Sequence, residues 1–135
     1  MGDRAIWGFR DTPESPVLYL YSHWGGADQL TELMSAISWA VGRWNDPAYA
    51  NRIATSRIIG EDWLRETGWG LSIGHYTLPD YETYRMTTWS DQTVGIWTLD
   101  GITSTGEELS RQSFEDFLRD PAPMEGEPEF QGVRL

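Results

Sequence analysis

Residues 17–26, Val-Leu-Tyr-Leu-Tyr-Ser-His-Trp-Gly-Gly, decide the fold because they lead an apolar strand through a glycine pair into a helix. The run that ends at His23 predicts the strand, and the apolar periodicity that begins soon after Gly26 predicts the helix. The first N–H groups of a helix have no partner within it, so this corner is expected to suit an anionic or polar ligand. The stretch thus locates a candidate site without naming a reaction.

Elements on both sides of this stretch follow from the same kinds of pattern. Residues 4–10 predict a strand, and the turn-rich connector after it predicts an antiparallel hairpin with residues 17–23. Apolar side chains at helical spacing predict a helix over residues 28–44. A second helix is expected to begin at an Asp46 cap, with proline in its first position, and to end at Gly60.

The second half of the chain predicts extended segments and one short helix. The glycine-rich residues 68–74 indicate an extended segment, and residues 81–89 and 93–98 predict a hairpin. Ser113 and Asp116 match a capping box for a short helix that buries an apolar face. That face consists of Phe114, Phe117 and Leu118. The predicted fold is α+β: an antiparallel sheet of about five strands, with two main helices and a short C-terminal helix on one face.

Length and composition limit the organisation of the chain. Its 135 residues suit one domain, predicted over residues 1–120. Residues 121–135, rich in proline and glutamate, predict a flexible acidic tail. The absence of cysteine excludes disulfides and thiolate metal sites. No signal peptide or membrane-spanning run is visible, so a cytoplasmic location in a host cell, with no membrane contact, is expected.

The charge distribution is uneven and excludes one class of partner. The formal net charge is −11, of which residues 1–60 carry −1 (six acids, five arginines) and residues 61–135 carry −10 (fifteen acids, five arginines). Direct nucleic-acid binding is therefore not expected. All ten basic residues are arginines. Codon usage in a GC-rich genome explains this most simply, while recognition of phosphate or carboxylate by arginine is the functional alternative.

Eight tryptophans are a high count for a chain of this length. Trp44 lies on the apolar face of the first predicted helix and is expected in the core. The other seven exceed what a small core easily holds, and tryptophan is common where flat ligands or protein surfaces are bound. The seven are Trp7, Trp24, Trp39, Trp63, Trp69, Trp89 and Trp97. An aromatic recognition surface is the prediction.

Motifs for catalysis and for metal or cofactor binding are missing. The two histidines, His23 and His75, lack any metal-ligand spacing, so no metal and no cofactor are predicted. Residues 70–74 match the letters of a serine nucleophile elbow, but the strand and the long helix that the elbow needs are not predicted around them. No catalytic residue is assigned, although His23 could serve in acid–base chemistry.

The strongest candidate site combines the strand–helix corner with arginines of the second helix and the glycine-rich segment. Aromatic rings stack on bases, arginines hold phosphates and glycine lets backbone approach a ligand. The predicted ligand-binding residues are Tyr21, His23, Trp24, Gly25, Gly26, Arg52, Arg57 and Trp69.

Three segments resemble a group of short proteins of tailed bacteriophages, especially phages of actinobacteria. They are Tyr21-x-His23-Trp24-x-Gly26, residues 57–60 through 68–71, and Ser113–Phe117. The resemblance covers most of residues 4–119. Gly25 stands where aspartate is common in that group, so no catalytic carboxylate carries over. The group implies no established activity, but its phage setting implies a protein that interferes with the host.

Three functions from different classes remain open. The leading hypothesis is a phage-encoded binding protein that counters host defence, by sequestering a nucleotide-derived immune signal. The second is a protein–protein inhibitor of a host enzyme, and the third is a small hydrolase or nuclease that uses His23. The expected partner is accordingly a nucleotide-like small molecule or a host protein, and homo-oligomers are compatible with either.

Overall fold

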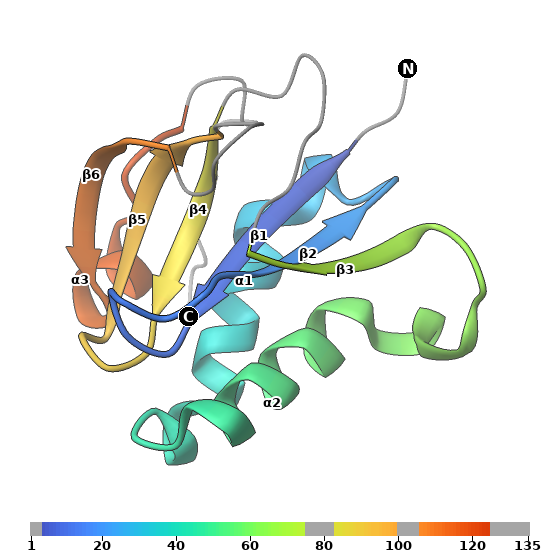
Figure 1. Cartoon of the computed structure of the whole chain (residues 1–135), viewed down its shortest axis with the longest axis horizontal. Coiled ribbons are helices and arrows are strands. Elements are labelled where there is room, and N and C mark those ends of the chain that lie inside the picture. Colours follow the sequence, from blue (N-terminus) through green and yellow to red (C-terminus); the bar gives the residue numbers. More distant parts are fainter. Residues whose placement is uncertain (1–3, 75–82, 100–105, 125–135) are drawn as a thin grey trace.

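A six-stranded mixed β-sheet lies at the centre of the protein, with strand order β3-β2-β1-β4-β5-β6 (Figure 1). The computed structural model describes residues 4–74, 83–99 and 106–124 of the chain. The strands are β1 (Ala5–Arg10), β2 (Leu18–Ser22), β3 (Trp69–Ile73), β4 (Thr83–Thr88), β5 (Thr93–Thr98) and β6 (Glu108–Ser113). The helices are α1 (Gln29–Trp39), α2 (Pro47–Ile59) and α3 (Phe114–Arg119), with the 3₁₀ turns η1 (Gly26–Asp28), η2 (Val41–Arg43) and η3 (Gly60–Leu64).

Both predicted hairpins are present. Strands β1 and β2 pair antiparallel, with Trp7 opposite Leu20, and β4 pairs antiparallel with β5. Between β4 and β5 the chain turns through Gln92, whose φ of 54° lies in the left-handed region. The predicted extended segment forms β3, which pairs antiparallel with β2 and places Trp69 opposite Ser22.

The sheet differs in two respects from the predicted antiparallel sheet of about five strands. Strands β1 and β4 pair parallel, which makes the sheet mixed. A sixth strand, β6, pairs with β5 at the edge. The α+β class itself is confirmed. Parallel pairing joins segments far apart in sequence, and a polar edge strand has no apolar alternation, so neither feature leaves a local signal.

The first predicted helix is divided into three parts. Residues 26–28 form η1, α1 ends at Trp39, and η2 follows. The change of direction brings Trp44 back against the helix, where its Nε1–H donates to the carbonyl of Ile37 at 2.9 Å. The Trp44 ring also meets Phe114 of α3 edge to face, at 4.8 Å between centroids. The apolar face therefore continues to Trp44, but on a tighter turn.

The second predicted helix matches α2, with Pro47 in its first turn and Gly60 at its end in a left-handed conformation (φ 58°). Asp46 occupies the N-cap position, but its side chain accepts no capping hydrogen bond. The Asp46 carboxylate instead lies 3.9 Å from Arg43. By contrast, Ser113 caps α3 as predicted, accepting from the backbone N–H of Asp116 at 3.1 Å.

The main core lies between the sheet and the helices. It joins Trp7 and Phe9 of β1 to apolar residues of α1, α2 and α3. A smaller buried cluster on the alternate side chains of the strands includes Tyr19 and Tyr84 and contains no helical residue. The described helices thus pack against one face of the sheet. Burial raises the pKa of the Tyr84 hydroxyl, whose oxygen lies 3.3 Å from that of Tyr19.

The first residues of the predicted tail are packed. Pro121 and Met124 are buried, and Arg85 donates to the carbonyl of Ala122 at 2.7 Å. The N–H of Ala122 donates to the side chain of Gln112 at 2.8 Å. Packing therefore extends to Met124, and the rest of the predicted tail lies outside the described residues. In the described ranges, none of the helices has the length and apolar character needed to cross a membrane.

Candidate functional site

A cavity of about 400 Å³ opens where β2 ends, η1 begins and α2 runs into η3. We call it the corner cavity. It lies where the last residue of β2, Ser22, pairs with the first residue of β3, Trp69. Figure 1 shows how these strand ends lie relative to α2 and η3. Its walls combine aromatic rings, backbone and charged side chains. They are formed by Trp7, Ser22, Trp24, Gly25, Asp28, Glu32, Arg57, Ile58, Ile59, Gly60, Glu61, Asp62 and Trp69.

The strand–helix corner takes its shape from close contacts at Gly25. A Cβ atom at this position would lie 2.9 Å from Oγ of Ser22 and 3.1 Å from the Trp7 ring. The corner is also joined to the chain before β3, since the N–H of His23 donates to the carbonyl of Gly68 at 2.9 Å. The sequence predicts that Gly25 lets the backbone approach a ligand. In the structure, its missing side chain lets the backbone lie close to Ser22 and Trp7 at the base of the cavity.

Three tryptophans give the corner cavity flat walls. Trp7 is only 2% exposed and donates its Nε1–H to the carbonyl of Gln29 at 2.9 Å. The Trp69 ring stacks on it, with 6.4 Å between centroids and 15° between planes. Trp24 is 59% exposed and its ring covers Gly68. The cavity thus has a fixed aromatic floor and an exposed aromatic rim.

Acidic groups outnumber basic ones in this cavity. Four carboxylates, from Asp28, Glu32, Glu61 and Asp62, face one guanidinium, from Arg57. The carboxylate of Glu32 lies 3.7 Å from Arg57, while that of Asp62 accepts from Nε1 of Trp69 at 3.2 Å. Burial raises the pKa of Glu32, and the nearby Asp28 adds to that rise against the opposing effect of Arg57.

Two of the N–H groups at the corner that an anion site could use are bonded within the chain. The N–H of Trp24 donates to Oγ of Ser22 at 3.3 Å, and that of Asp28 donates to the carbonyl of Gly25 at 3.2 Å. Asp28 and Glu32 also place negative charge at the start of α1. A phosphate at this helix end would meet repulsion rather than attraction.

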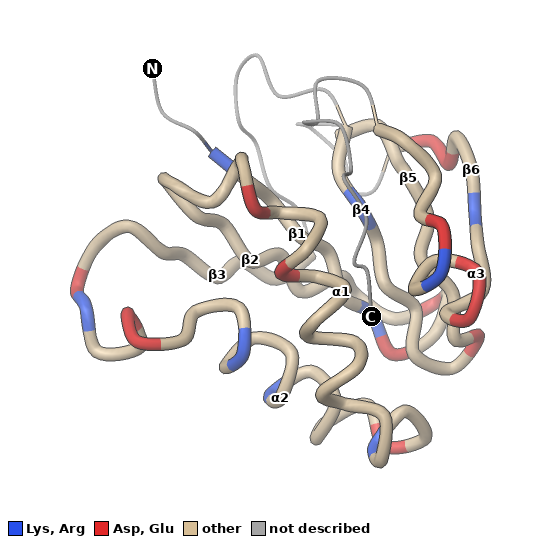
Figure 2. The backbone as a smooth tube through the Cα atoms, turned by 180° about the vertical axis from the view of Figure 1, so that it is seen from behind, with Lys and Arg blue, Asp and Glu red and all other residues tan. Residues whose placement is uncertain are grey.

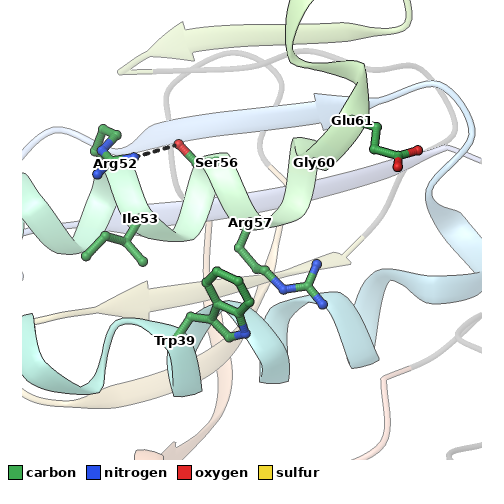
Figure 3. Close-up of a pocket in the computed structure, with 7 residues that line it drawn as sticks. All are labelled: Trp39, Arg52, Ile53, Ser56, Arg57, Gly60 and Glu61. Atoms are coloured by element: carbon green, nitrogen blue, oxygen red, sulfur yellow. Dashed lines mark hydrogen bonds between the residues drawn. The ribbon is translucent and has the colours of Figure 1, made fainter.

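A second hollow, of about 500 Å³, lies along α1 and α2 and is drawn in Figure 3. We call it the helix groove. Trp39 projects from α1 toward Ile53 and Arg57 of α2, while Arg52 and Ser56 lie on another side of α2 (Figure 3). The groove is completed by Gly60 and Glu61. Trp39 is 68% exposed, so this wall is open to solvent.

Arg57 belongs to both hollows. Its guanidinium lies over the Trp39 ring, 5.1 Å from the centroid, and one of its nitrogens lies 3.7 Å from the carboxylate of Glu32. Its Nε is buried and has no hydrogen-bond partner among the described residues. Buried donors without a partner are rare in native proteins. The Nε–H of Arg57 is therefore the hydrogen-bond donor of these two hollows that most needs a partner from outside the described residues.

The predicted site residues divide between the two hollows. Trp24, Gly25, Arg57 and Trp69 line the corner cavity, whereas Arg52 lies in the helix groove. Tyr21, His23 and Gly26 line neither hollow. The Tyr21 hydroxyl lies 3.0 Å from Nδ1 of His23, and the two side chains form an exposed pair beside the corner.

Other residues of the hollows were not predicted as site residues. The acidic walls at Asp28, Glu32, Glu61 and Asp62 come from segments that the sequence indicates only as solvated surface. Trp39 belongs to the predicted aromatic surface, but nothing in its spacing connects it to Arg57. Helical periodicity within each helix could have placed both residues away from the core, and only the packing of α1 on α2 brings them together.

The tryptophans do not all form a recognition surface. Trp7 and Trp89 are buried in the core, and Trp89 donates its Nε1–H to Asn51 of α2 at 2.6 Å. Trp24, Trp39 and Trp63 are exposed. Trp44, Trp69 and Trp97 are half-buried. Of the seven tryptophans predicted to be more than a small core easily holds, Trp7 on β1 and Trp89 directly after β4 are in the core.

Neither metal chemistry nor histidine chemistry gains support from this geometry. In the ranges that the structure describes, no group of three or more His, Asp or Glu side chains is placed to hold a metal ion. His23 is exposed and meets the Trp24 ring edge to face at 4.9 Å. His75 lies outside the described residues, as does any pairing of it with His23.

Comparison with known proteins adds no information on function, so the functional interpretation depends on the geometry of the two hollows. No family model, no curated protein and no solved structure matches the chain.

Proposed function

We propose that this chain is a binding protein that sequesters a nucleotide-derived small molecule in the corner cavity, and thereby counters a defence system of the cell infected by its phage. The observation that carries the proposal is the aromatic cavity of about 400 Å³ at the corner formed by Trp24 and Gly25. That volume falls within the range of small-molecule sites. A sequestering protein needs retention of its ligand and no catalytic group.

The charges of the cavity restrict how such a ligand would lie. Its base would stack on Trp24 or Trp69, as bases do on aromatic side chains. The carboxylates of Asp28 and Glu61 would accept hydrogen bonds from amino or sugar hydroxyl groups, as acidic residues accept from ribose in dinucleotide sites. A phosphate would have to lie at Arg57, because the other charged groups that line the cavity are acidic. Ligands with one exposed anionic group fit this arrangement better than polyphosphates.

Titration calorimetry of the full chain with a panel of nucleosides, nucleoside monophosphates and cyclic dinucleotides tests the proposal. We expect one or more of these ligands to bind, and Trp24→Ala to weaken the binding. Trp63→Ala is the matched control, because Trp63 is also exposed (54%) but does not line the corner cavity. Absence of binding across the panel, or equal losses in both variants, would contradict the proposal.

Inhibition of a host protein is a second candidate function, favoured by the exposed aromatic groups of the helical face. Trp39 and Tyr49 are 68% and 53% exposed, and each is covered by an arginine, Arg57 and Arg43 respectively. Tryptophan, tyrosine and arginine are the residues enriched at the energetic centres of protein interfaces. This candidate needs a partner protein and is compatible with an empty corner cavity.

A further inference from the structure

Helix α2 and the turn before it differ in charge from the rest of the chain, whereas α1 carries one acidic residue, Glu32. Residues 40–60 contain three arginines and one aspartate, a net charge of +2. The whole chain carries −11, so the remaining residues sum to −13. Helix α2 itself carries Arg52 and Arg57 and no acidic residue, which Figure 2 shows as blue segments without red. A basic stripe on an acidic protein attracts an acidic partner while the surroundings repel it from other faces.

Apolar surface lies on and beside this stripe. The helix groove runs between Trp39 of α1 and Ile53 of α2, with a volume of about 500 Å³. Val41, which is 60% exposed, and Tyr49 lie on the segments that follow Trp39. Apolar side chains rimmed by charged groups are the usual composition of a protein-binding groove. The groove is therefore suited to a side chain that enters between the helices while acidic neighbours meet the rim.

Two arginines of this stripe, Arg52 in the groove and Arg43 in η2, can receive carboxylates. Arg52 makes one hydrogen bond, of 3.3 Å, from its guanidinium to Oγ of Ser56, and has no salt bridge among the described residues. Arg43 lies over the Tyr49 ring, 4.5 Å from the centroid, and its contact with Asp46 is long at 3.9 Å. Guanidinium groups have five donors, so both arginines retain donors for a partner.

We propose that the helix groove is a docking site for an acidic segment of another protein, one in which an apolar side chain is flanked by glutamates or aspartates. The apolar side chain would lie between Trp39 and Ile53, and the flanking carboxylates would meet Arg52 in the groove and Arg43 in η2, the turn that follows α1. The groove shares Arg57, Gly60 and Glu61 with the corner cavity, but Trp39 and Arg52 line only the groove and Trp24 lines only the cavity. Variants at these three residues therefore test the two hollows independently. A second copy of this chain is the less favourable occupant, because two-fold packing of this face would set its arginines against each other.

Fluorescence anisotropy of the full chain tests the proposal with a labelled peptide in which glutamates flank a central leucine. The comparison peptide carries glutamine at every glutamate position. We expect Trp39→Ala and Arg52→Gln each to weaken binding of the glutamate peptide about tenfold. The matched controls Trp63→Ala and Arg119→Gln change an exposed tryptophan and an exposed arginine elsewhere, and are expected to bind as the wild type does.

Three outcomes would overturn the proposal. Equal affinity for the glutamine peptide would remove the role of charge. Equal losses in the control variants would show that binding is not at the groove. Light scattering that detects a dimer of the wild type, and a monomer of Trp39→Ala, would assign the face to contact between copies of the chain instead. Circular dichroism of each variant separates loss of binding from loss of the fold.

Discussion

The corner cavity and the helix groove share Arg57, Gly60 and Glu61, yet they are built from different parts of the protein. The corner cavity has a core residue as its floor, Trp7, and acidic side chains on its walls. The helix groove has a solvent-exposed wall, Trp39, and arginines on its rim. A cavity whose floor is a buried core residue keeps its shape and therefore suits a small ligand. A groove formed by exposed side chains suits a large partner that covers it.

Truncation of Trp7 tests whether the corner cavity is built on the core and the helix groove on the surface. It has the largest expected effect on the free energy of unfolding. Trp7 is buried, stacked on Trp69 and hydrogen-bonded through Nε1. Trp7→Ala should lower the free energy of unfolding by about 3–5 kcal/mol, the usual cost of removing a large aromatic side chain from a core. Trp39→Ala should cost less than about 1 kcal/mol, as surface substitutions do. Urea unfolding of both variants measures the difference, and equal costs would contradict it.

Ligand binding separates the two hollows next. For a nucleotide-like ligand in the corner cavity, Trp24→Ala and Trp69→Ala should each weaken binding by about 1–3 kcal/mol, the range for one base–aromatic stack. Trp39→Ala should leave this affinity unchanged, since Trp39 does not line the cavity. Titration calorimetry provides the measurement. A larger loss in Trp39→Ala than in Trp24→Ala would move the ligand to the helix groove.

Two glycines with nearly equal φ angles test whether contact with Gly68 positions Trp24 at the rim of the corner cavity. Gly68 and Gly74 have φ values of 95° and 94°. A Cβ atom would meet the Trp24 ring at Gly68, but at Gly74 it would meet none of the described residues within 4 Å. Each alanine variant should lose about 1 kcal/mol of stability for its strained backbone, and Gly68→Ala alone should also displace Trp24. Tryptophan fluorescence and ligand affinity measure that displacement, and identical behaviour of the two variants would exclude it.

The excess of acidic groups in the corner cavity predicts a small pH effect. Because burial raises the pKa of Glu32, its ionised form disfavours the folded state once the pH exceeds that pKa, and this cost vanishes below the pKa of the unfolded chain. Glu32→Gln should therefore raise the melting temperature slightly at neutral pH and lose this advantage below about pH 4. Glu115→Gln, on the exposed surface of α3, is the control. A lower melting temperature at neutral pH would mean that the Arg57 ion pair outweighs the burial.

Local patterns predicted most helices and strands but not the order of the sheet. Pro47 and Gly60 delimit α2, and Ser113 begins α3, because caps are set by neighbouring residues. Strand β6 contains one large apolar side chain, Leu109, which is exposed. An edge strand of this kind is held by backbone hydrogen bonds to β5 rather than by burial, so its sequence carries no alternation. The parallel pairing of β1 with β4 depends on the whole sheet.

Spacing in the sequence could bring together only those residues of the candidate site that lie in one continuous segment, between the end of β2 and η1. Trp24 and Gly25 reach the corner cavity because the strand end and η1 place them there. Arg52 and Arg57, five residues apart on one helix, could not be assigned to one hollow from their spacing alone. In the structure both line the helix groove, and Arg57 alone also lines the corner cavity. The acidic walls required knowledge of how α1, α2 and η3 converge, which no local pattern contains.

Recovery of an intact ligand tests sequestration without turnover most directly. The full chain would be incubated with a mixture of cyclic mononucleotides and cyclic dinucleotides, passed through a desalting column, denatured by heat and analysed by chromatography. The account predicts that one ligand stays with the protein and is released chemically unchanged, and that Trp24→Ala retains much less of it. Release of a cleaved product, in repeated turnovers that His23→Ala abolishes, would contradict the account.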